Sequence, residues 1–431
     1  MDDRDLLIRA LVGVWAELPG LVGDDWPVFE AQVLIRLRAL EAASPKDVEN
    51  ACDAVLAEFD AHPAARGRLV EAYAVVAPSL ERGSADRPRV AGSTGHARYL
   101  EIPIFFATDR ALAADASAPP FYSGERNPKH LTYGIARVSV PDDHRSGSLE
   151  KPRWWKLQFR QDPEQFVIVL GVDALDRAAF VAGARQLIAT AVLPEALVFI
   201  HGYNVSFDDA ARRAAQIAYD LHFEGLTLLY SWASEGAFVR YGVDKENAKW
   251  SLPRFRSFLT LVLSELGASH VHAIAHSMGN EVCANGLATF DTSALAPGAA
   301  TLRQIVFAAP DVDAATFGDL AVQFHGRADH FTLYASSKDK ALQASQGYQK
   351  YPRAGQAGDG LVIVDGVDTI DASDLDTGFM SHSYIGDHTS ILSDVDELIR
   401  RGTPADKRER LSTSKHSRGT YWKVMPGVVA T

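Results

Sequence analysis

The chain has 431 residues, of which 47% are hydrophobic and 23% charged, a composition typical of a globular protein with room for more than one domain. Its formal net charge of −12 argues against a general nucleic-acid or anionic-membrane binder, because such proteins present a basic surface. The two cysteines, Cys52 and Cys283, predict neither a disulfide framework nor a cysteine-based zinc site, and they fit a reducing compartment.

The amino-terminal residues give no sign of export. The first ten residues are acidic where a signal peptide would be basic, and Arg9 interrupts their short apolar run. No apolar stretch approaches the length of a membrane span. We therefore expect a soluble cytoplasmic protein without a membrane span.

Residues 1–80 are predicted to form helices only. Apolar residues recur at helical spacing near the start and again after a Gly-Asp-Asp-Trp-Pro turn, a further helix begins at Ser44-Pro45, and a fourth follows Pro63. The two apolar patterns consist of Leu6, Leu7, Ala10, Leu11, Val14 and Trp15, and of Val28, Phe29, Val33, Leu34, Leu37 and Leu40. This indicates a small helical bundle, with a possible role as an interaction or adaptor module.

Residues 81–97 are polar and rich in Gly, Ser and Pro, which predicts a linker. From residue 98 to 431, strand-like apolar runs alternate with helical patterns. Strands are expected near residues 99–108, 131–141, 166–172, 196–202, 226–232, 270–275, 304–310, 330–336 and 360–365, and helices near 174–190, 206–222, 246–266, 279–290, 314–323 and 389–401. Such alternation predicts an α/β domain with a mostly parallel sheet covered on both faces, in which ligands bind at the carboxyl ends of the strands.

One strand end carries the pentapeptide Ala275-His276-Ser277-Met278-Gly279. A nucleophilic serine on a sharp strand-to-helix turn needs small residues two positions before and after it, and Ala275 and Gly279 meet that need. A serine that only caps the next helix would give the same local pattern. Residues at the other strand ends are therefore needed to distinguish a nucleophilic Ser277 from a helix cap.

Later strand ends supply an acid and then a histidine, in the chain order of an α/β-hydrolase triad. Serine is a poor nucleophile at its free pKa, so an imidazole must take its proton and a carboxylate must orient that imidazole. Asp339 follows a strand at the required position, whereas Asp311 and Asp313 follow the preceding strand and could instead cap a helix. The histidine is expected to be His382, with the alternative, His388, at the start of the last helix.

An oxyanion hole needs two backbone N–H donors. The residue after the nucleophile, Met278, supplies one, and the loop His201-Gly202-Tyr203-Asn204 supplies the other through Tyr203, with Asn204 as the alternative. His201 itself is expected to be a buried histidine that pins this loop by hydrogen bonds.

Several longer segments resemble a bacterial α/β-hydrolase family of unknown function within the esterase/lipase superfamily. They are L-V-F-I-H-G-Y-N, L-Y-S-W-A-S, A-I-A-H-S-M-G-N, A-A-P-D-V-D and L-Y-A-S-S-K-D-K, with F-F-A-T-D-R and Y-G-I-A-R-V-S-V-P upstream. The resemblance covers roughly residues 98–425 and implies a hydrolase without naming a substrate. One departure is Ala233, where the family commonly has proline, and we expect it to affect only loop rigidity.

Two polar segments were interpreted as surface features. The acidic stretch 365–376 lacks the spacing of an EF-hand and is expected to be a solvated loop over the active site. The basic residues after Arg400 are expected to form a solvated tail that packs on the acidic body. Neither segment calls for a metal or a cofactor, so none is expected.

The sequence thus predicts a serine hydrolase that cleaves an ester or related acyl bond through Ser277, His382 and Asp339. An acyltransferase with the same triad is an alternative, because that chemistry serves either acceptor. A second alternative is a partner-regulated effector, in which residues 1–80 mediate recruitment or self-association.

Overall fold

The computed structural model describes the chain in several stretches. They comprise residues 7–8, 10–11, 14–15, 17–41, 48–59, 62, 64–69, 98–114, 116, 119–146, 149–150, 162–234, 241–375 and 388–425. Its contacts divide the chain into two compact units. The helices before residue 70 belong to the first unit, and the large sheet with its covering helices belongs to the second. The predicted linker, residues 81–97, lies outside the described residues.

The first unit is helical, as its spacing of apolar residues predicted. Its elements are α2 (Leu18–Val22), a 3₁₀ turn (Gly23–Asp25), α3 (Trp26–Glu41) and α4 (Val48–Ala57), and residues 64–69 are also helical. The core includes Leu11, Phe29, Val33 and Phe59, which are at most 3% exposed. Two residues of the apolar pattern in α3, Val28 and Leu34, are more than 40% exposed and so lie outside this core. The predicted helix start at Ser44-Pro45 lies outside the described residues.

The second unit is built on a mixed sheet whose strands lie in the order β12-β13-β11-β10-β9-β8-β6-β7-β1-β4-β5. Neighbouring strands from β1 through β7, β6, β8, β9, β10 and β11 to β13 are parallel, and antiparallel strands close both edges. The strands are β1 (Tyr99–Thr108), β4 (Thr132–Pro141), β5 (Ile168–Leu175), β6 (Glu195–Ile200), β7 (Leu226–Ser231), β8 (His270–His276), β9 (Thr301–Ala308), β10 (His330–Ala335), β11 (Asp368–Asp371), β12 (Leu411–His416) and β13 (Gly419–Val424), with a separate pair β2 (Arg110–Leu112) and β3 (Tyr122–Arg126).

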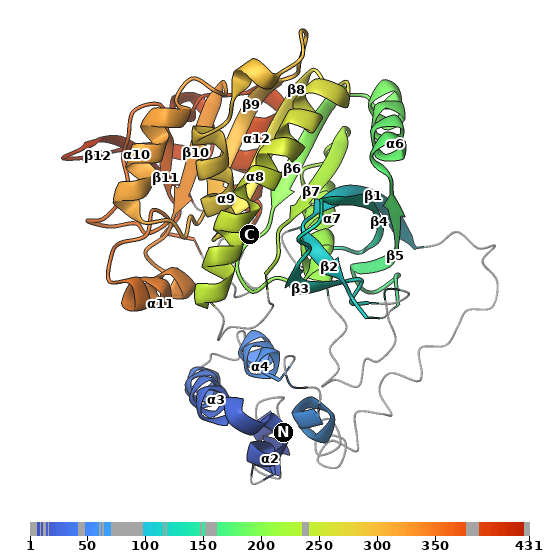
Figure 1. Cartoon of the computed structure of the whole chain (residues 1–431). Coiled ribbons are helices and arrows are strands. Elements are labelled where there is room, and N and C mark those ends of the chain that lie inside the picture. The colour runs from blue at the N-terminus through green and yellow to red at the C-terminus, as the bar shows by residue number, and fades with distance from the viewer. Residues whose placement is uncertain are drawn as a thin grey trace. The chain divides into compact units, whose positions relative to one another are not determined.

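Helices cover both faces of this sheet, with α8, α9 and α10 in front of it and α7 and α12 behind it (Figure 1). The helices are α6 (Arg177–Thr190), α7 (Phe207–Asp220), α8 (Tyr241–Glu265), α9 (Gly279–Ala288), α10 (Ala314–Phe324), α11 (Lys340–Gln349) and α12 (His388–Arg401). Successive side chains of β1 show why both faces need cover, because Phe105 packs on Phe180 of α6 while Phe106 packs on Phe207 of α7. None of the described helices is long and apolar enough to cross a membrane.

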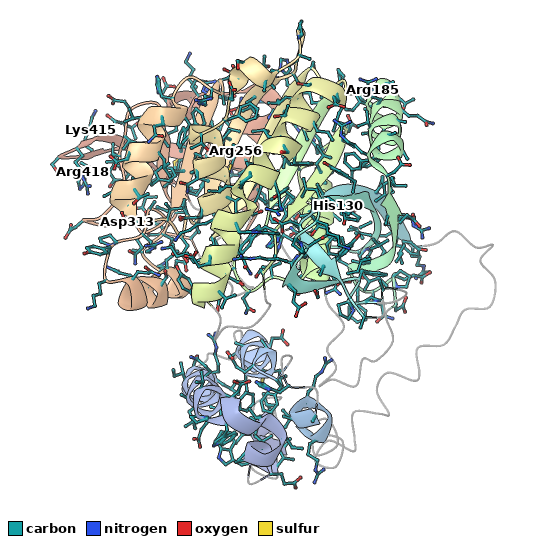
Figure 2. All side chains as sticks on the ribbon, in the orientation of Figure 1. His130, Arg185, Arg256, Asp313, Lys415 and Arg418 are labelled. Atoms are coloured by element: carbon teal, nitrogen blue, oxygen red, sulfur yellow. The ribbon has the colours of Figure 1, made fainter. Side chains whose placement is uncertain are left out.

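Three sequence expectations about the carboxyl-terminal third were wrong. No strand forms at residues 360–365; strand β11 lies later, inside the acidic stretch that was interpreted as a solvated loop. Its two central residues, Thr369 and Ile370, are completely buried between two parallel neighbours. The basic tail is likewise ordered, since β12 and β13 form a hairpin at the sheet edge, where Lys415 and Arg418 are seen in Figure 2. Helix α11 had not been predicted.

Candidate active site

Ser277 lies between β8 and α9, at the carboxyl edge of the sheet, with a backbone φ of 52°. This left-handed conformation is uncommon for a residue with a side chain and turns the chain sharply from strand to helix. Backbone groups hold the turn on both sides: the Ser277 N–H donates to the Ala308 carbonyl at 3.0 Å, and the Ser277 carbonyl accepts from the Asp311 N–H at 3.1 Å. The Asn280 side chain donates to both of these carbonyls. The geometry matches that of a nucleophile elbow and differs from that of an ordinary helix cap, which is extended.

The small residues predicted around Ser277 are required by close backbone contacts. A methyl group at Gly279 would lie 2.3 Å from the carbonyl oxygen of His201, so the first turn of α9 packs directly against the end of β6. A methyl group at Gly202 would lie 2.9 Å from the Ser277 Cβ, and Ala275 is completely buried. The loop after β6 and the serine elbow are therefore in direct contact.

The two predicted oxyanion donors lie on either side of this contact. Met278 precedes the first residue of α9 and is 1% exposed, so its N–H belongs to the amino-terminal end of that helix. Tyr203 lies in the turn after β6, next to Gly202, and is 7% exposed. Its neighbour Asn204 has a φ of 56°, and the Asn204 N–H lies 3.5 Å from Asp244 Oδ2. The Asn204 N–H is thus directed to a carboxylate, and Tyr203 stays the predicted second donor.

His201 is buried and pins the loop after β6, as the sequence predicted. Its Nδ1 lies 2.8 Å from the Gly202 carbonyl, and its ring stacks on Trp232 with an interplanar angle of 8°. The Trp232 indole N–H in turn donates to the His201 carbonyl at 2.8 Å. Burial and the neighbouring Arg110 guanidinium hold the pKa of His201 well below its usual value, so the imidazole is neutral and acts as a structural element.

The three candidate acids occupy different environments. Asp339 follows β10, is 2% exposed, and accepts the Leu342 N–H at 3.0 Å where α11 begins. Asp311 is committed elsewhere: its carboxylate pairs with the buried Arg353 at 2.8 Å and accepts from the Tyr241 hydroxyl at 2.9 Å. Asp313, labelled in Figure 2, caps α10 through the Thr316 N–H. Of the three carboxylates, the one of Asp339 best matches an acid of a triad.

The structure describes only one of the two candidate histidines. His382 lies outside the described residues. His388 is the first residue of α12, at the end of the same segment. Ser277 and Asp339 follow β8 and β10, which are separated by one parallel strand, so both belong to the same edge of the sheet.

Sequence reasoning missed a set of polar residues that hold the strand-end loops. Thr108 and Asp109, at the end of β1, bind the loop after β7: the Thr108 hydroxyl donates to the Ser231 carbonyl at 2.6 Å, and Asp109 Oδ1 accepts the Ala233 N–H at 2.7 Å. Asp109 and the adjacent Arg110 are at most 1% exposed. The signal was present in F-F-A-T-D-R, because two adjacent charges directly after an apolar strand must be paired if they are buried.

One half-buried carboxylate lies one helical turn beyond the nucleophile. Glu281 belongs to the first turn of α9, and burial raises the pKa of its carboxyl group. Among the described residues, no group of three or more His, Cys, Asp or Glu side chains is arranged to hold a metal ion.

Comparison with known proteins agrees with this geometry. The model of a family described as "alpha/beta hydrolase of unknown function" (DUF900) matches residues 184–401, which carry β6 to β11 and the serine elbow. No curated protein matches the chain. The matched region spans half of the sequence, and the chain belongs to this family of alpha/beta hydrolases.

Proposed function

We propose that the protein is a serine hydrolase that cleaves an ester or related acyl bond, with Ser277 as its nucleophile. The observation that supports this most is the left-handed backbone of Ser277 at the junction of β8 and α9. A strained conformation in a serine is retained only where surrounding contacts over-determine it, and here it places the side chain, 6% exposed, at the carboxyl edge of the sheet.

In this mechanism His382 takes the proton of the Ser277 hydroxyl as the oxygen attacks the acyl carbon, and Asp339 orients the imidazole. The N–H groups of Met278 and Tyr203 stabilise the oxyanion of the tetrahedral intermediate. His382 then returns the proton to the leaving group, and water releases the acyl group from Ser277 by the reverse steps. The reaction needs no cofactor.

A fluorophosphonate probe tests the nucleophile. The probe should label the wild-type protein and the control Ser293→Ala, whose side chain is exposed, and it should leave Ser277→Ala unlabelled. Equal labelling of Ser277→Ala would refute the assignment. A panel of p-nitrophenyl esters of increasing chain length then defines the acyl group, and added alcohol acceptors distinguish hydrolysis from acyl transfer.

The same assay separates the two histidines. His382→Ala should lose labelling and esterase activity, because the serine loses its base, at a cost of about 10⁴-fold or more. His388→Ala should keep both within about threefold. The opposite result would assign the base to His388.

A second candidate role, self-association through residues 1–80, is favoured by one feature of the first unit. Val28 and Ile35 of α3 are 41% and 57% exposed and lie seven residues apart, and Leu34 lies beside Ile35. Residues seven apart lie on one helical face, so such a row can pack against its own copy about a twofold axis. We propose a second copy of this chain as the occupant. Light scattering of the full chain should give twice the mass found for Ile35→Glu, and equal masses would contradict it.

A further inference from the structure

Arg110 is a fully buried cation at the beginning of β2, immediately after the end of β1. Its side chain is 1% exposed, and a buried guanidinium is retained only where its N–H groups find acceptors. One acceptor is the Ser123 carbonyl of β3 at 3.3 Å, and others come from the ends of β6 and β7 and the loops that follow them. The loop after β6 contacts the serine elbow, and this arrangement identifies a role beyond packing.

The first loop is the one after β7. The Arg110 Nε donates to the Ser231 hydroxyl at 2.9 Å, and its Nη1 donates to the Ser234 carbonyl at 2.8 Å. The second loop is the one after β6. There the Arg110 Nη2 donates to the Val205 carbonyl at 2.7 Å and lies 3.2 Å from the His201 Nε2. One planar fork therefore ties both loops to the end of β1, a geometry that lysine cannot reproduce.

The contact with His201 fixes which ring nitrogen carries the proton. The His201 Nε2 lies 3.2 Å from the guanidinium, which only donates, and 3.1 Å from the Trp232 carbonyl, which only accepts, while the Nδ1 lies 2.8 Å from the Gly202 carbonyl. A proton on Nε2 would oppose the guanidinium and would leave two acceptors, Nδ1 and the Gly202 carbonyl oxygen, 2.8 Å apart, whereas a proton on Nδ1 satisfies both of these contacts. The proton of the neutral ring is then on Nδ1, which lies 2.8 Å from the Gly202 carbonyl and donates to it. Arg110 thus favours the tautomer whose Nδ1–H donates a hydrogen bond to the Gly202 carbonyl.

The grip on Gly202 orients the next N–H group. The Gly202 carbonyl and the Tyr203 N–H belong to one planar trans peptide and point in opposite directions. Holding the carbonyl on the His201 side therefore directs the Tyr203 N–H away from His201. The same peptide lies against the elbow, because a methyl at Gly202 would approach the Ser277 Cβ to 2.9 Å.

We propose that Arg110 is a positioning residue that, through the His201 ring, sets the orientation of the Gly202–Tyr203 peptide and so of the second oxyanion donor. This inference rests on the proposed function, since it assigns the means by which the oxyanion site of that reaction is held. Arg110 acts through His201 and the peptide without itself touching the substrate.

The first test needs no substrate. ¹⁵N NMR of the imidazoles in the wild-type protein, with His201 assigned by His201→Gln, should show His201 neutral at pH 7, with its proton on Nδ1 and none on Nε2. A protonated Nε2 would overturn the proposed chain of contacts whether or not the protein is a hydrolase.

The second test compares kinetics with p-nitrophenyl acetate in Arg110→Gln, Arg110→Lys and the control Arg408→Gln. Arg408 is also buried, at 3% exposed, but pairs with Asp394 of α12. Loss of one oriented oxyanion donor costs about 10²–10³-fold in kcat, so Arg110→Gln should lose about 10²-fold with KM changed by less than about threefold. Arg110→Lys keeps the charge without the fork and should lose at least about tenfold, which keeps the test available if the glutamine variant does not fold.

The control separates positioning from stability. Arg408→Gln should lower the unfolding midpoint while kcat of the folded fraction stays within about twofold of the wild-type value. Folded Arg110 variants with a wild-type kcat, or with KM raised and kcat unchanged, would overturn the inference while leaving the proposed function intact. A wild-type protein that no fluorophosphonate labels would instead overturn the proposed function itself.

Discussion

Replacing Ser277 by glycine should make the protein inactive and more stable. The left-handed backbone at φ 52° costs a residue with a side chain about 1–2 kcal/mol, and glycine does not meet this cost. Glycine also raises the conformational entropy of the unfolded chain, which offsets about 0.4–1 kcal/mol of that gain. The backbone hydrogen bonds to Ala308 and Asp311 survive the substitution. The free energy of unfolding should therefore rise by about 0.5–1 kcal/mol.

Ser277→Ala is the matched control for this prediction. Alanine removes the hydroxyl but keeps the strained backbone, so its free energy of unfolding should stay within about 0.5 kcal/mol of the wild-type value. Urea unfolding followed by tryptophan fluorescence gives the midpoints of the three proteins, compared at equal slopes. Both variants should be unreactive toward a fluorophosphonate. If Ser277→Gly were no more stable than Ser277→Ala, the elbow would not be strained and the main support for the nucleophile would be lost.

Three further predictions follow from the buried polar groups of the site. Asp339→Asn should lower esterase activity about 10³–10⁴-fold, while the free energy of unfolding changes by less than about 1 kcal/mol because asparagine also caps a helix. Asp311→Asn should instead lower the free energy of unfolding in urea by about 3 kcal/mol, because it leaves the charge of Arg353 without a counter-charge. If only Asp311→Asn lost most of its activity, Asp311 would replace Asp339 as the acid of the proposed triad. The pKa of His201 is depressed in the folded state, so the unfolded state binds a proton first as the pH falls below about 6.5. Below that pH the free energy of unfolding should therefore fall by up to about 1.4 kcal/mol per pH unit because of this residue. The His201→Gln variant should lack this slope when unfolding is measured between pH 7 and pH 5, and parallel curves would contradict the buried neutral ring. Gly279→Ala should destabilise by about 1–3 kcal/mol, since its methyl would lie 2.3 Å from a backbone carbonyl, and an unchanged urea midpoint would show that the elbow can move away from β6.

The central part of the fold could be predicted from the sequence because its strands are buried on both faces. Runs such as 196–200 and 226–231 are mostly apolar, and in the structure every residue of β6 and β7 is buried. The helices between them begin and end within a few residues of the expected positions. The small residues Ala275 and Gly279 also indicated the sharp turn, since only small side chains tolerate the backbone contacts there.

The edge of the sheet could not be predicted, because it is held by pairs of charges that the sequence does not show as pairs. Arg408, from the segment interpreted as a solvated tail, is buried against Asp394 of α12 and Asp368 of β11. Read one at a time, each of these residues is an ordinary surface charge. These charges can be buried only because the fold brings the three residues together. A local sequence pattern does not contain that tertiary information.

The proposed site likewise depends on residues outside the proposed triad. A strained serine and a correctly turned peptide both lie above the lowest local energy of the chain, and neither persists unless surrounding groups exclude the alternatives. At Ser277 this is achieved by backbone hydrogen bonds with Ala308 of β9 and Asp311 in the loop after it, and by the Asn280 amide, which donates to the Ser277 and Ala308 carbonyls. At Gly202 our proposal assigns this part to His201, whose tautomer Arg110 would set. Both sets of hydrogen bonds are buried, so removing one partner leaves the other without a hydrogen bond. We therefore expect such substitutions to disturb the geometry of the proposed site as well as to lower the free energy of unfolding.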